Sequence, residues 1–303
     1  MTYTARRGTI EVEDRASWMR AKLASSLLLR GATMAGGPIV RHVPGARHDM
    51  EQWWARSVRR ALRVDLAIEG ADNIQPDEQY IVVANHEGMF DPVALLHLPL
   101  HLRFAVRSEI FDWHDVGAYL DASNQVAVDP EQGMTGFRRL IVESRRSFGR
   151  GESLAIFAQG TLLGIETAFQ AGAFRLATMT GRPVLPVVIT GSHRVWEHPF
   201  QPTLRLDQKV GVRVLPPVPP VGPAAELRDR VQERVKAAAL DGSMPLPRRY
   251  DPDRDGLWNQ YHFDIDPAFA AVAARVATAR LELAQVPRGV SPKTARRPSP
   301  PNA

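Results

Sequence analysis

The residues best suited to chemistry are His86 and Asp91, which stand five positions apart in the stretch Asn85-His86-Glu87-Gly88-Met89-Phe90-Asp91-Pro92. An imidazole held by a carboxylate can act as a general base, because the carboxylate orients the ring and stabilises its charged form. On a straight helix, a separation of five residues points two side chains about 140° apart. The pair can therefore meet only if His86 lies in a loop and Asp91 lies at the mouth of the next helix.

The flanking residues predict a strand, a loop and a helix in that order. Residues 80–84 form a short apolar run that indicates a buried strand, and residues 93–96 indicate the start of a helix. Asp91 directly before Pro92 predicts an N-cap followed by the first helical residue. We therefore expect His86 at the carboxyl end of a strand, where α/β proteins carry their functional residues. A lone His beside a capping Asp is also common without catalysis, so this motif alone leaves a structural role open.

Four blocks in order resemble those of the glycerolipid acyltransferase family typified by 1-acylglycerol-3-phosphate acyltransferase. The first is the stretch that contains His86 and Asp91. The other three are Phe157-Ala158-Gln159-Gly160-Thr161, Phe169-Gln170-Ala171-Gly172-Ala173-Phe174 and Pro183-Val184-Leu185-Pro186-Val187-Val188-Ile189. The resemblance extends over residues 67–221, and four ordered blocks are far more specific than the first alone.

The resemblance implies an enzyme that moves a fatty acyl group from acyl-CoA or acyl carrier protein to the hydroxyl of a lysophospholipid, most simply 1-acylglycerol-3-phosphate. It implies His86 as the general base and Asp91 as its partner, with backbone N–H groups around Gly160 and Thr161 stabilising the tetrahedral oxygen. It requires neither a metal nor a bound cofactor. The substrate-binding residues that follow from this interpretation are Asn85, Gln159, Gly160, Thr161, Arg107 and Arg138.

The chain departs from the family pattern where the acceptor is bound. Ala158-Gln159 replaces the usual Pro-Glu, and Leu162 and Pro130 stand where the family usually has Arg. We expect substitute cations among Arg103, Arg107, Arg138 and Arg139. The alternatives are an acyltransferase for another lysolipid or a glycolipid, a thioesterase-like hydrolase, and a lipid-binding module that has lost its chemistry.

Composition limits the remaining choices. A chain of 303 residues with 44% hydrophobic and 23% charged residues is typical of a globular protein. The absence of Cys excludes disulfides, thiolate catalysis and Cys-based zinc sites. The net charge of +5 suits anionic membranes or nucleic acid, but no nucleic-acid-binding motif is present, so no nucleic-acid partner is predicted. Residues 1–20 lack the apolar core of a signal peptide, and no apolar run is long enough to span a membrane. We expect a peripheral protein at the cytoplasmic face of a membrane.

The expected fold class is α/β, with a mostly parallel or mixed sheet flanked by helices. Residues 1–66 form an amphipathic two-helix segment, in which Trp53 and Trp54 oppose Arg residues and favour membrane contact over simple core packing. Residues 67–221 form the core, 222–286 a helical buttress and 287–303 a disordered tail. Helices are predicted over 133–149 and 170–180. The predicted strands are 64–68, 80–84, 103–106, 125–128, 154–157, 184–190 and 210–215.

Two other patterns suggest metal binding only weakly. Residues 251–256 match the start of a calcium loop, but His262 occupies the position of the required bidentate Glu, which favours an ordinary turn. His97 and His101 have the spacing of helical metal ligands, but Pro99 between them interrupts such a helix.

Overall fold

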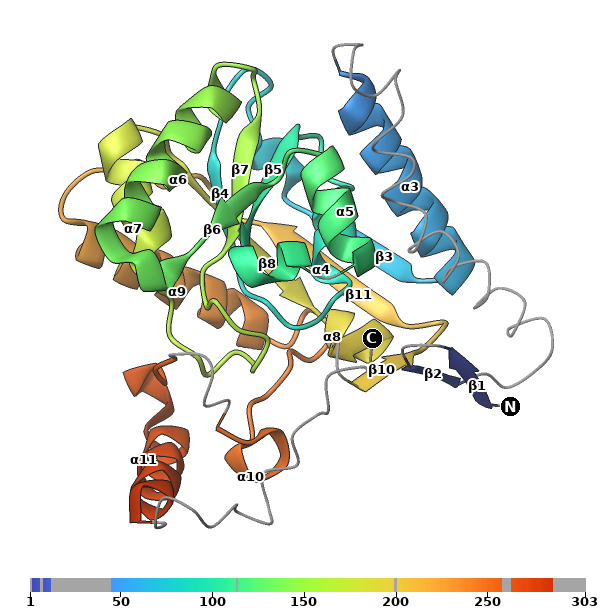
Figure 1. Ribbon diagram of the computed structural model, residues 1–303, viewed down its shortest axis with the longest axis vertical. Helices are drawn as coiled ribbons and strands as arrows, with labels where there is room; N and C mark the ends of the chain where they lie inside the picture. The colour runs from blue at the N-terminus through green and yellow to red at the C-terminus, as the bar shows by residue number, and fades with distance from the viewer. Residues whose placement is uncertain are drawn as a thin grey trace.

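A seven-stranded sheet forms the centre of the molecule in the computed structural model, which describes residues 2–5, 8–11, 45–112, 114–198, 201–257 and 263–285 (Figure 1). Its strands, in spatial order, are β3 (Asp65–Glu69), β11 (Lys209–Val214), β8 (Val184–Thr190), β4 (Ile81–Ala84), β7 (Ser153–Phe157), β5 (Leu102–Arg107) and β6 (Val126–Val128). All seven strands predicted from the sequence are present, within one or two residues at their ends.

The sheet is mixed, as predicted. From β8 to β6 the five neighbouring strands run parallel, whereas β11 and β3 run parallel to each other and opposite to β8. Strand β4 is central, because Ile81 pairs with Leu154 of β7 on one side and Val184 of β8 on the other. The loops that leave these three strands therefore meet at one edge of the sheet.

Successive residues of β4 face opposite sides, as the two-residue period of a strand requires. Ile81 and Val83 pack into one hydrophobic core, and Val82 and Ala84 pack into the other. The first core lies under α6 (Gly133–Phe148), α7 (Gly172–Thr180) and α9 (Ala224–Leu240). The second lies under α3 (Ala46–Leu62) and α4 (Asp91–Leu95). Figure 1 shows α6 and α7 on the opposite side of the sheet from α3.

Several elements of the structure were not predicted. A small second sheet has the strand order β1-β2-β10-β9, with β10 pairing parallel to β2. Its strands are β1 (Thr2–Ala5), β2 (Gly8–Glu11), β10 (Gln201–Leu204) and β9 (Trp196–His198). The additional helices are α5 (His114–Ala122), α8 (Ser192–Val195) and α10 (Pro252–Asp255). Helix α11 (Ala270–Gln285), in contrast, lies within residues 222–286, which were predicted to be helical.

The apolar face of α3 packs on the sheet. Trp54, Val58 and Leu62 are buried in the same core as Val82, and only Trp53 is substantially exposed, at 49%. The prediction that this face contacts a membrane is wrong for α3, because the core already covers it. Residues 16–44, which contain the first predicted amphipathic helix, lie outside the described residues. Within the described part of the chain, no helix is long and apolar enough to span a bilayer.

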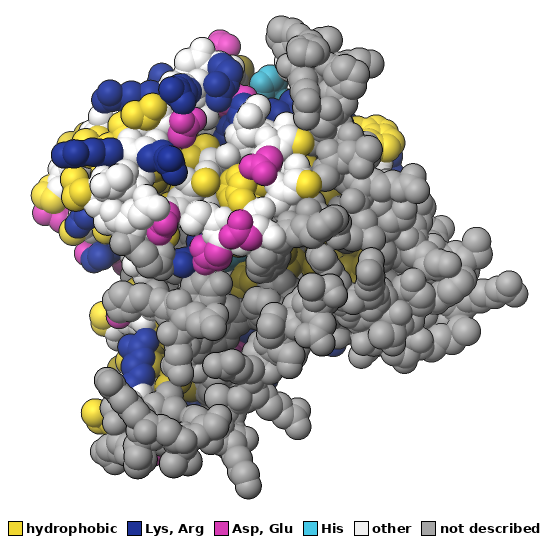
Figure 2. All heavy atoms as spheres, in the orientation of Figure 1, with side chains coloured by type: hydrophobic (Ala, Val, Ile, Leu, Met, Phe, Trp, Pro, Cys, Tyr) yellow, Lys and Arg dark blue, Asp and Glu magenta, His cyan; other side chains and the backbone are white. Residues whose placement is uncertain are grey.

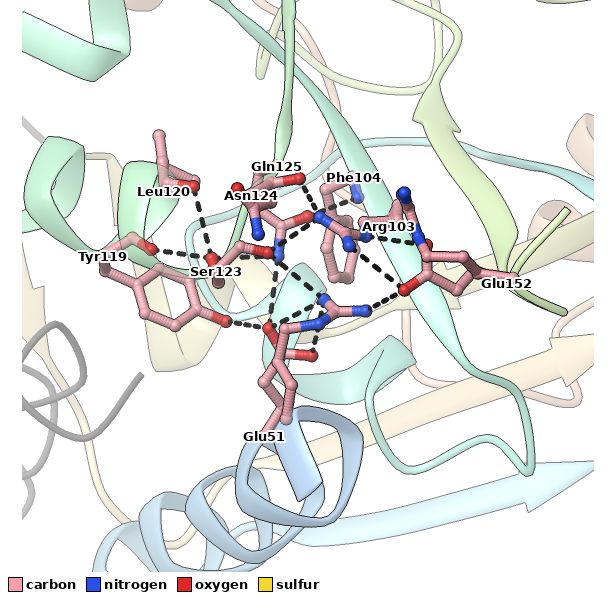
Figure 3. Close-up of polar contacts among 11 residues, drawn as sticks. Glu51, Arg103, Phe104, Tyr119, Leu120, Ser123, Asn124, Gln125 and Glu152 are labelled. Carbon is pink, nitrogen blue, oxygen red and sulfur yellow. Dashed lines mark hydrogen bonds and ion pairs between the residues drawn. The ribbon is translucent and has the colours of Figure 1, made fainter. Parts of the chain in front are cut away.

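A buried polar network also ties α3 to the sheet (Figure 3). Glu51 on α3 accepts hydrogen bonds from Tyr119 (2.9 Å), Gln125 (3.2 Å) and Arg47 (3.3 Å). Burial raises the pKa of Glu51, and the neighbouring Arg47 opposes that shift. The donors around Glu51 thus satisfy a carboxylate that would otherwise be costly to bury.

Arg103 belongs to the same network and not to the site around His86. Its guanidinium binds Glu152 at 2.9 and 3.1 Å and is buried. Arg103 lies at the start of β5, in register with Leu154 of β7, whereas His86 follows the end of β4, the parallel strand on the other side of β7. The expectation that Arg103 binds the acceptor is therefore wrong.

The residues after the sheet cover the first core and extend beyond it. Helix α9 packs on this core through an apolar stripe, since Leu227, Val231 and Val235 are fully buried in it. Helix α11 packs through Val276 in a smaller cluster with Phe263. Residues 287–303, the predicted disordered tail, lie outside the described residues.

The two patterns that suggested metal ligands are engaged in other contacts. Asp251 and Asp253 bind Arg275 at 2.7 and 2.5 Å, which makes their segment a charge-paired turn. The Nδ1 atom of His97 lies 2.8 Å from the Val93 carbonyl, and His101 lies against the ring of His48. His262 lies outside the described residues.

We expect Phe174→Ala to lower the free energy of unfolding by about 3–5 kcal/mol, because the ring is fully buried between α7 and the sheet. Urea denaturation measures this change. Met179→Ala on the same helix is the matched control, since Met179 is exposed and its truncation should cost less than about 0.5 kcal/mol. Equal effects of the two substitutions would contradict the packing described for α7.

Candidate active site

His86 and Asp91 meet at the carboxyl edge of the sheet. His86 follows β4, and its Nδ1 atom lies 2.6 Å from Oδ2 of Asp91. The imidazole stacks on the ring of Phe157 from the end of β7, with centroids 3.9 Å apart and planes 11° from parallel. The side chain of His86 remains 18% exposed, whereas that of Asp91 is fully buried. One edge of the ring is thus fixed by protein, and the other is accessible.

The carboxylate of Asp91 binds the loop that precedes it. Its Oδ2 atom accepts hydrogen bonds from the amides of Glu87 (2.7 Å) and Gly88 (3.1 Å), and Oδ1 accepts one from the hydroxyl of Ser192. Asp91 was predicted to be the N-cap of its helix, but it is the first helical residue and Phe90 occupies the N-cap position. That prediction was wrong because the loop folds back, so the carboxylate meets loop amides in place of the helix's own.

These contacts fix which nitrogen of His86 carries the proton. A carboxylate that also accepts two amide hydrogens can only accept from the imidazole, so Nδ1 donates to Asp91. The Nε2 atom then carries a free lone pair, and it is the nitrogen that can remove a proton from a bound hydroxyl.

Two buried amide side chains hold the loop that carries His86. Asn85 forms a reciprocal pair with the backbone of Ile189 on β8, at 2.7 and 2.9 Å. The Oε1 atom of Gln159 accepts a hydrogen bond from the His86 amide at 2.7 Å. Its Nε2 atom donates to the Gly164 carbonyl at 2.5 Å and to the Thr167 hydroxyl at 2.6 Å. The amide of Gln159 both accepts and donates here, whereas an ionised carboxylate could not donate to the Gly164 carbonyl.

The turn after Gln159 contains the predicted tetrahedral-oxygen site. Gly160 has a φ of 68°, a conformation that favours glycine, and its N–H donates to the Phe157 carbonyl at 3.1 Å. The Gly160 amide is therefore already used within the turn. The buried hydroxyl of Thr161 has no hydrogen-bond partner among the described residues, so Thr161 is the better candidate donor.

Glu87, the residue after His86, anchors the loop from its buried side. Its carboxylate accepts hydrogen bonds from the amides of Gly191 (2.9 Å) and Arg248 (2.8 Å) and contacts Nδ1 of His193 at 3.1 Å. Burial raises the pKa of Glu87 well above its ordinary value, and the charge of Asp91 raises it further. Burial also lowers the pKa of His193 to about 4, so His193 is neutral at pH 7. Segments that follow β8 and α9 are thus joined to the loop of His86.

The predicted cationic residues lie in different places. Arg107 ends β5 at the same edge of the sheet as His86, and it pairs with Glu109. Arg138 and Arg139 are exposed on α6, and no hydrogen bond of the described residues links either one to His86. Of the four proposed cations, Arg107 is therefore the one that ends a strand at the same edge of the sheet as His86.

Sequence reasoning missed Ser192, Phe157 and Arg248. Ser192 follows β8, which is the strand next to β4. A hydroxyl directly after this strand was a signal that could have identified Ser192. Phe157 begins a block that was recognised, although no role was assigned to it. Arg248 lies 161 residues from Glu87 along the chain, and no local pattern links the two positions.

The chain is similar to known acyltransferases over part of its length. Residues 65–190 match a protein-family model described as Acyltransferase. A 1-acyl-sn-glycerol-3-phosphate acyltransferase of Chlamydomonas reinhardtii is 26% identical over 196 residues, which are 64% of this chain and 58% of that protein. The enzyme of the same name from Bacillus subtilis is 25% identical over 140 residues, which are 43% of this chain and 68% of that protein. The chain thus spans about half to two thirds of the length of such relatives.

A solved structure has the same fold. The 1-acyl-sn-glycerophosphate acyltransferase PlsC of Thermotoga maritima superposes with a TM-score of 0.57 at 22% sequence identity. The match covers 75% of this chain and 94% of that one. The region it covers extends beyond residues 65–190, so the shared fold is larger than the matched family domain.

Proposed function

We propose that the chain is an O-acyltransferase that acylates a lysophospholipid hydroxyl, since residues 65–190 match a family model described as Acyltransferase. The donor is a fatty acyl thioester of coenzyme A or of acyl carrier protein, and 1-acylglycerol-3-phosphate is the leading acceptor. The single observation that supports this most is the 2.6 Å contact between His86 and the buried Asp91. The relatives are named for 1-acyl-sn-glycerol-3-phosphate, which supports that acceptor. The protein would act as a peripheral enzyme at the cytoplasmic face of the membrane.

In the proposed reaction, Nε2 of His86 removes the proton from the acceptor hydroxyl while its oxygen attacks the thioester carbonyl carbon. The tetrahedral intermediate then collapses, the carbon–sulfur bond breaks, and the imidazolium returns the proton to the leaving thiolate. Asp91 keeps Nδ1 protonated and stabilises the transient positive charge on the ring. A positioned base of this kind contributes about 10²–10⁴ to the rate.

The remaining residues have distinct proposed roles. The hydroxyl of Thr161 donates to the negative oxygen of the tetrahedral intermediate, supported by its buried and unpartnered state among the described residues. Asn85 and Gln159 act as positioning residues, because both amides are buried and used by protein partners. Phe157 fixes the plane of the imidazole by stacking. These roles revise the substrate-binding role first expected for Asn85 and Gln159.

The sequence departs most from the family pattern at the positions that would bind the acceptor. Pro130 is exposed and Leu162 is half-buried, so neither supplies the cation that the family pattern leads one to expect. Charge-assisted hydrogen bonds are about twice as strong as neutral ones, which makes the loss of Arg significant for a phosphate acceptor. Arg107 at the site edge is the strongest substitute, and Arg138 is second because it is exposed on α6. A lysolipid with a zwitterionic or hydroxyl-rich headgroup is therefore the second candidate acceptor.

An acceptor panel with one acyl-CoA donor tests the function. We expect coenzyme A thiol to be released only when an acceptor is present. With 1-acylglycerol-3-phosphate, the amount of thiol released should equal the amount of phosphatidate formed. Lysophospholipids with other headgroups and glycolipids are compared in the same assay. A preference for 1-acylglycerol-3-phosphate of about 10²-fold, or roughly 2.7 kcal/mol, would show that a substitute cation binds the phosphate.

The same assay separates the competing functions. Thiol release without any acceptor would indicate a hydrolase. Lysolipid binding without turnover of either coenzyme A or carrier-protein thioesters would indicate a binding module and would contradict the proposed activity.

A further inference from the structure

The outer surfaces of α6 and α7 form one exposed face rich in Arg, which we call the α6–α7 basic face. Helices α6 and α7 lie side by side (Figure 1), and Figure 2 shows dark blue side chains interspersed with yellow ones over them. The exposed residues that define the face are Met134, Arg138, Arg139, Val142, Arg145, Arg146, Arg175 and Met179.

The positive charge of this face is largely uncompensated. Arg146 pairs with Glu143 at 2.6 Å, but no carboxylate of the described residues forms an ion pair with the other four Arg residues of the face. Helix α9 on the same side of the sheet provides a contrast, because its Arg228 and Arg230 have acidic partners on the helix itself. The excess of Arg is therefore a property of α6 and α7 and not of every exposed helix.

Apolar side chains project from the same face. Met134 is 64% exposed, Val142 48% and Met179 55%, although the opposite sides of both helices are well packed. Exposed apolar residues among Arg residues are typical of surfaces that insert shallowly between lipid headgroups. The face is spread over two helices, which suits a fluid and extended partner.

We propose that the α6–α7 basic face binds the surface of an anionic phospholipid bilayer. The positive charge complements the acidic headgroups, and Met134, Val142 and Met179 enter the interface between headgroups and acyl chains. Helix α6 follows β6 after one short turn, Pro130–Gln132, and so begins at the edge of the sheet where His86 lies. Binding through this face would bring that edge close to the lipid. This membrane surface replaces the apolar face of α3, which the core occupies.

Vesicle co-sedimentation of the whole chain tests the proposal without any need for turnover. Phosphatidylcholine vesicles with and without phosphatidylglycerol are compared for the wild type and for the triple variant R145Q/R146Q/R175Q. We expect the variant to bind the anionic vesicles about 10²-fold more weakly, since each Arg near such a surface contributes a factor of about five. V142S/M179S should weaken the binding that persists in high salt, because apolar insertion is not screened.

The matched control is R228Q/R230Q/R234Q on α9, which removes the same charge from a balanced surface. An equal loss in this control would show that only net charge matters and would overturn the proposal. Undiminished vesicle binding by R145Q/R146Q/R175Q would also overturn it. If this variant kept its vesicle binding and lost binding to acyl carrier protein, the partner of the face would be an acidic protein. Turnover of a short-chain, water-soluble acceptor reports separately on the proposed activity.

Discussion

His86→Ala should lower kcat by about 10²–10⁴ while the protein stays folded. The imidazole is the base in the proposed mechanism, since its Nδ1 atom is held by Asp91 and the side chain remains 18% exposed. The backbone amide of residue 86 still donates to Gln159 in the variant, so the loop keeps that anchor. Single-turnover assays with a saturating acyl donor measure the chemical step directly.

Loss of the stack on Phe157 must be separated from loss of the base. His86→Phe retains an aromatic ring against Phe157 but has no nitrogen, so its activity should fall as far as that of His86→Ala. Its urea midpoint should stay closer to the wild type. Activity within about tenfold of the wild type in either folded variant would contradict the role of His86.

Asp91→Asn should also lower kcat by about 10²–10⁴, because it removes the negative charge that stabilises the imidazolium. The oxygen atom contacted by His86 also accepts hydrogen bonds from the amides of Glu87 and Gly88. The substituted amide can serve these donors with one oxygen only, and its NH₂ group cannot accept. We expect acceptor KM to change little, since the side chain is buried and does not face the substrate.

Ser192→Ala is the matched control for Asp91→Asn. It removes the hydrogen bond to Oδ1 and leaves the charge and the contact with His86 in place. Its kcat should fall by about tenfold or less, since a single net hydrogen bond contributes about 1 kcal/mol. If the two variants lose equal activity, geometry matters more than the charge of Asp91, and the proposed electrostatic role fails.

The sequence was sufficient to predict the strands and the loop of His86. Short apolar runs between Gly, Pro and polar clusters are strong local signals, and all seven predicted strands occur in the structure. The sequence also predicted that His86 and Asp91 can meet only if His86 lies in a loop and Asp91 at the mouth of a helix, and the structure has that arrangement. These features depend on residues close in the chain, whose preferences act before any tertiary contact forms.

Amphipathicity alone could not decide what covers an apolar helix face. Trp54 and Val58 of α3 lie in the core, whereas Met134 and Met179 are exposed among Arg residues. A helix with one apolar side satisfies the hydrophobic effect equally well against a sheet or a membrane, because the effect has no direction. Only the placement of the sheet determined which helix was already covered.

The sequence by itself determined the seven strands of the main sheet, the loop that carries His86 and the absence of Cys chemistry. The tertiary structure decided that Asp91 binds loop amides, that Gln159 positions the His86 loop, and that Arg103 lies at the far end of β5. It also joined Arg248 to Glu87 across 161 residues. Such contacts depend on which distant segments the fold brings together, so they cannot be predicted from a local pattern of residue types.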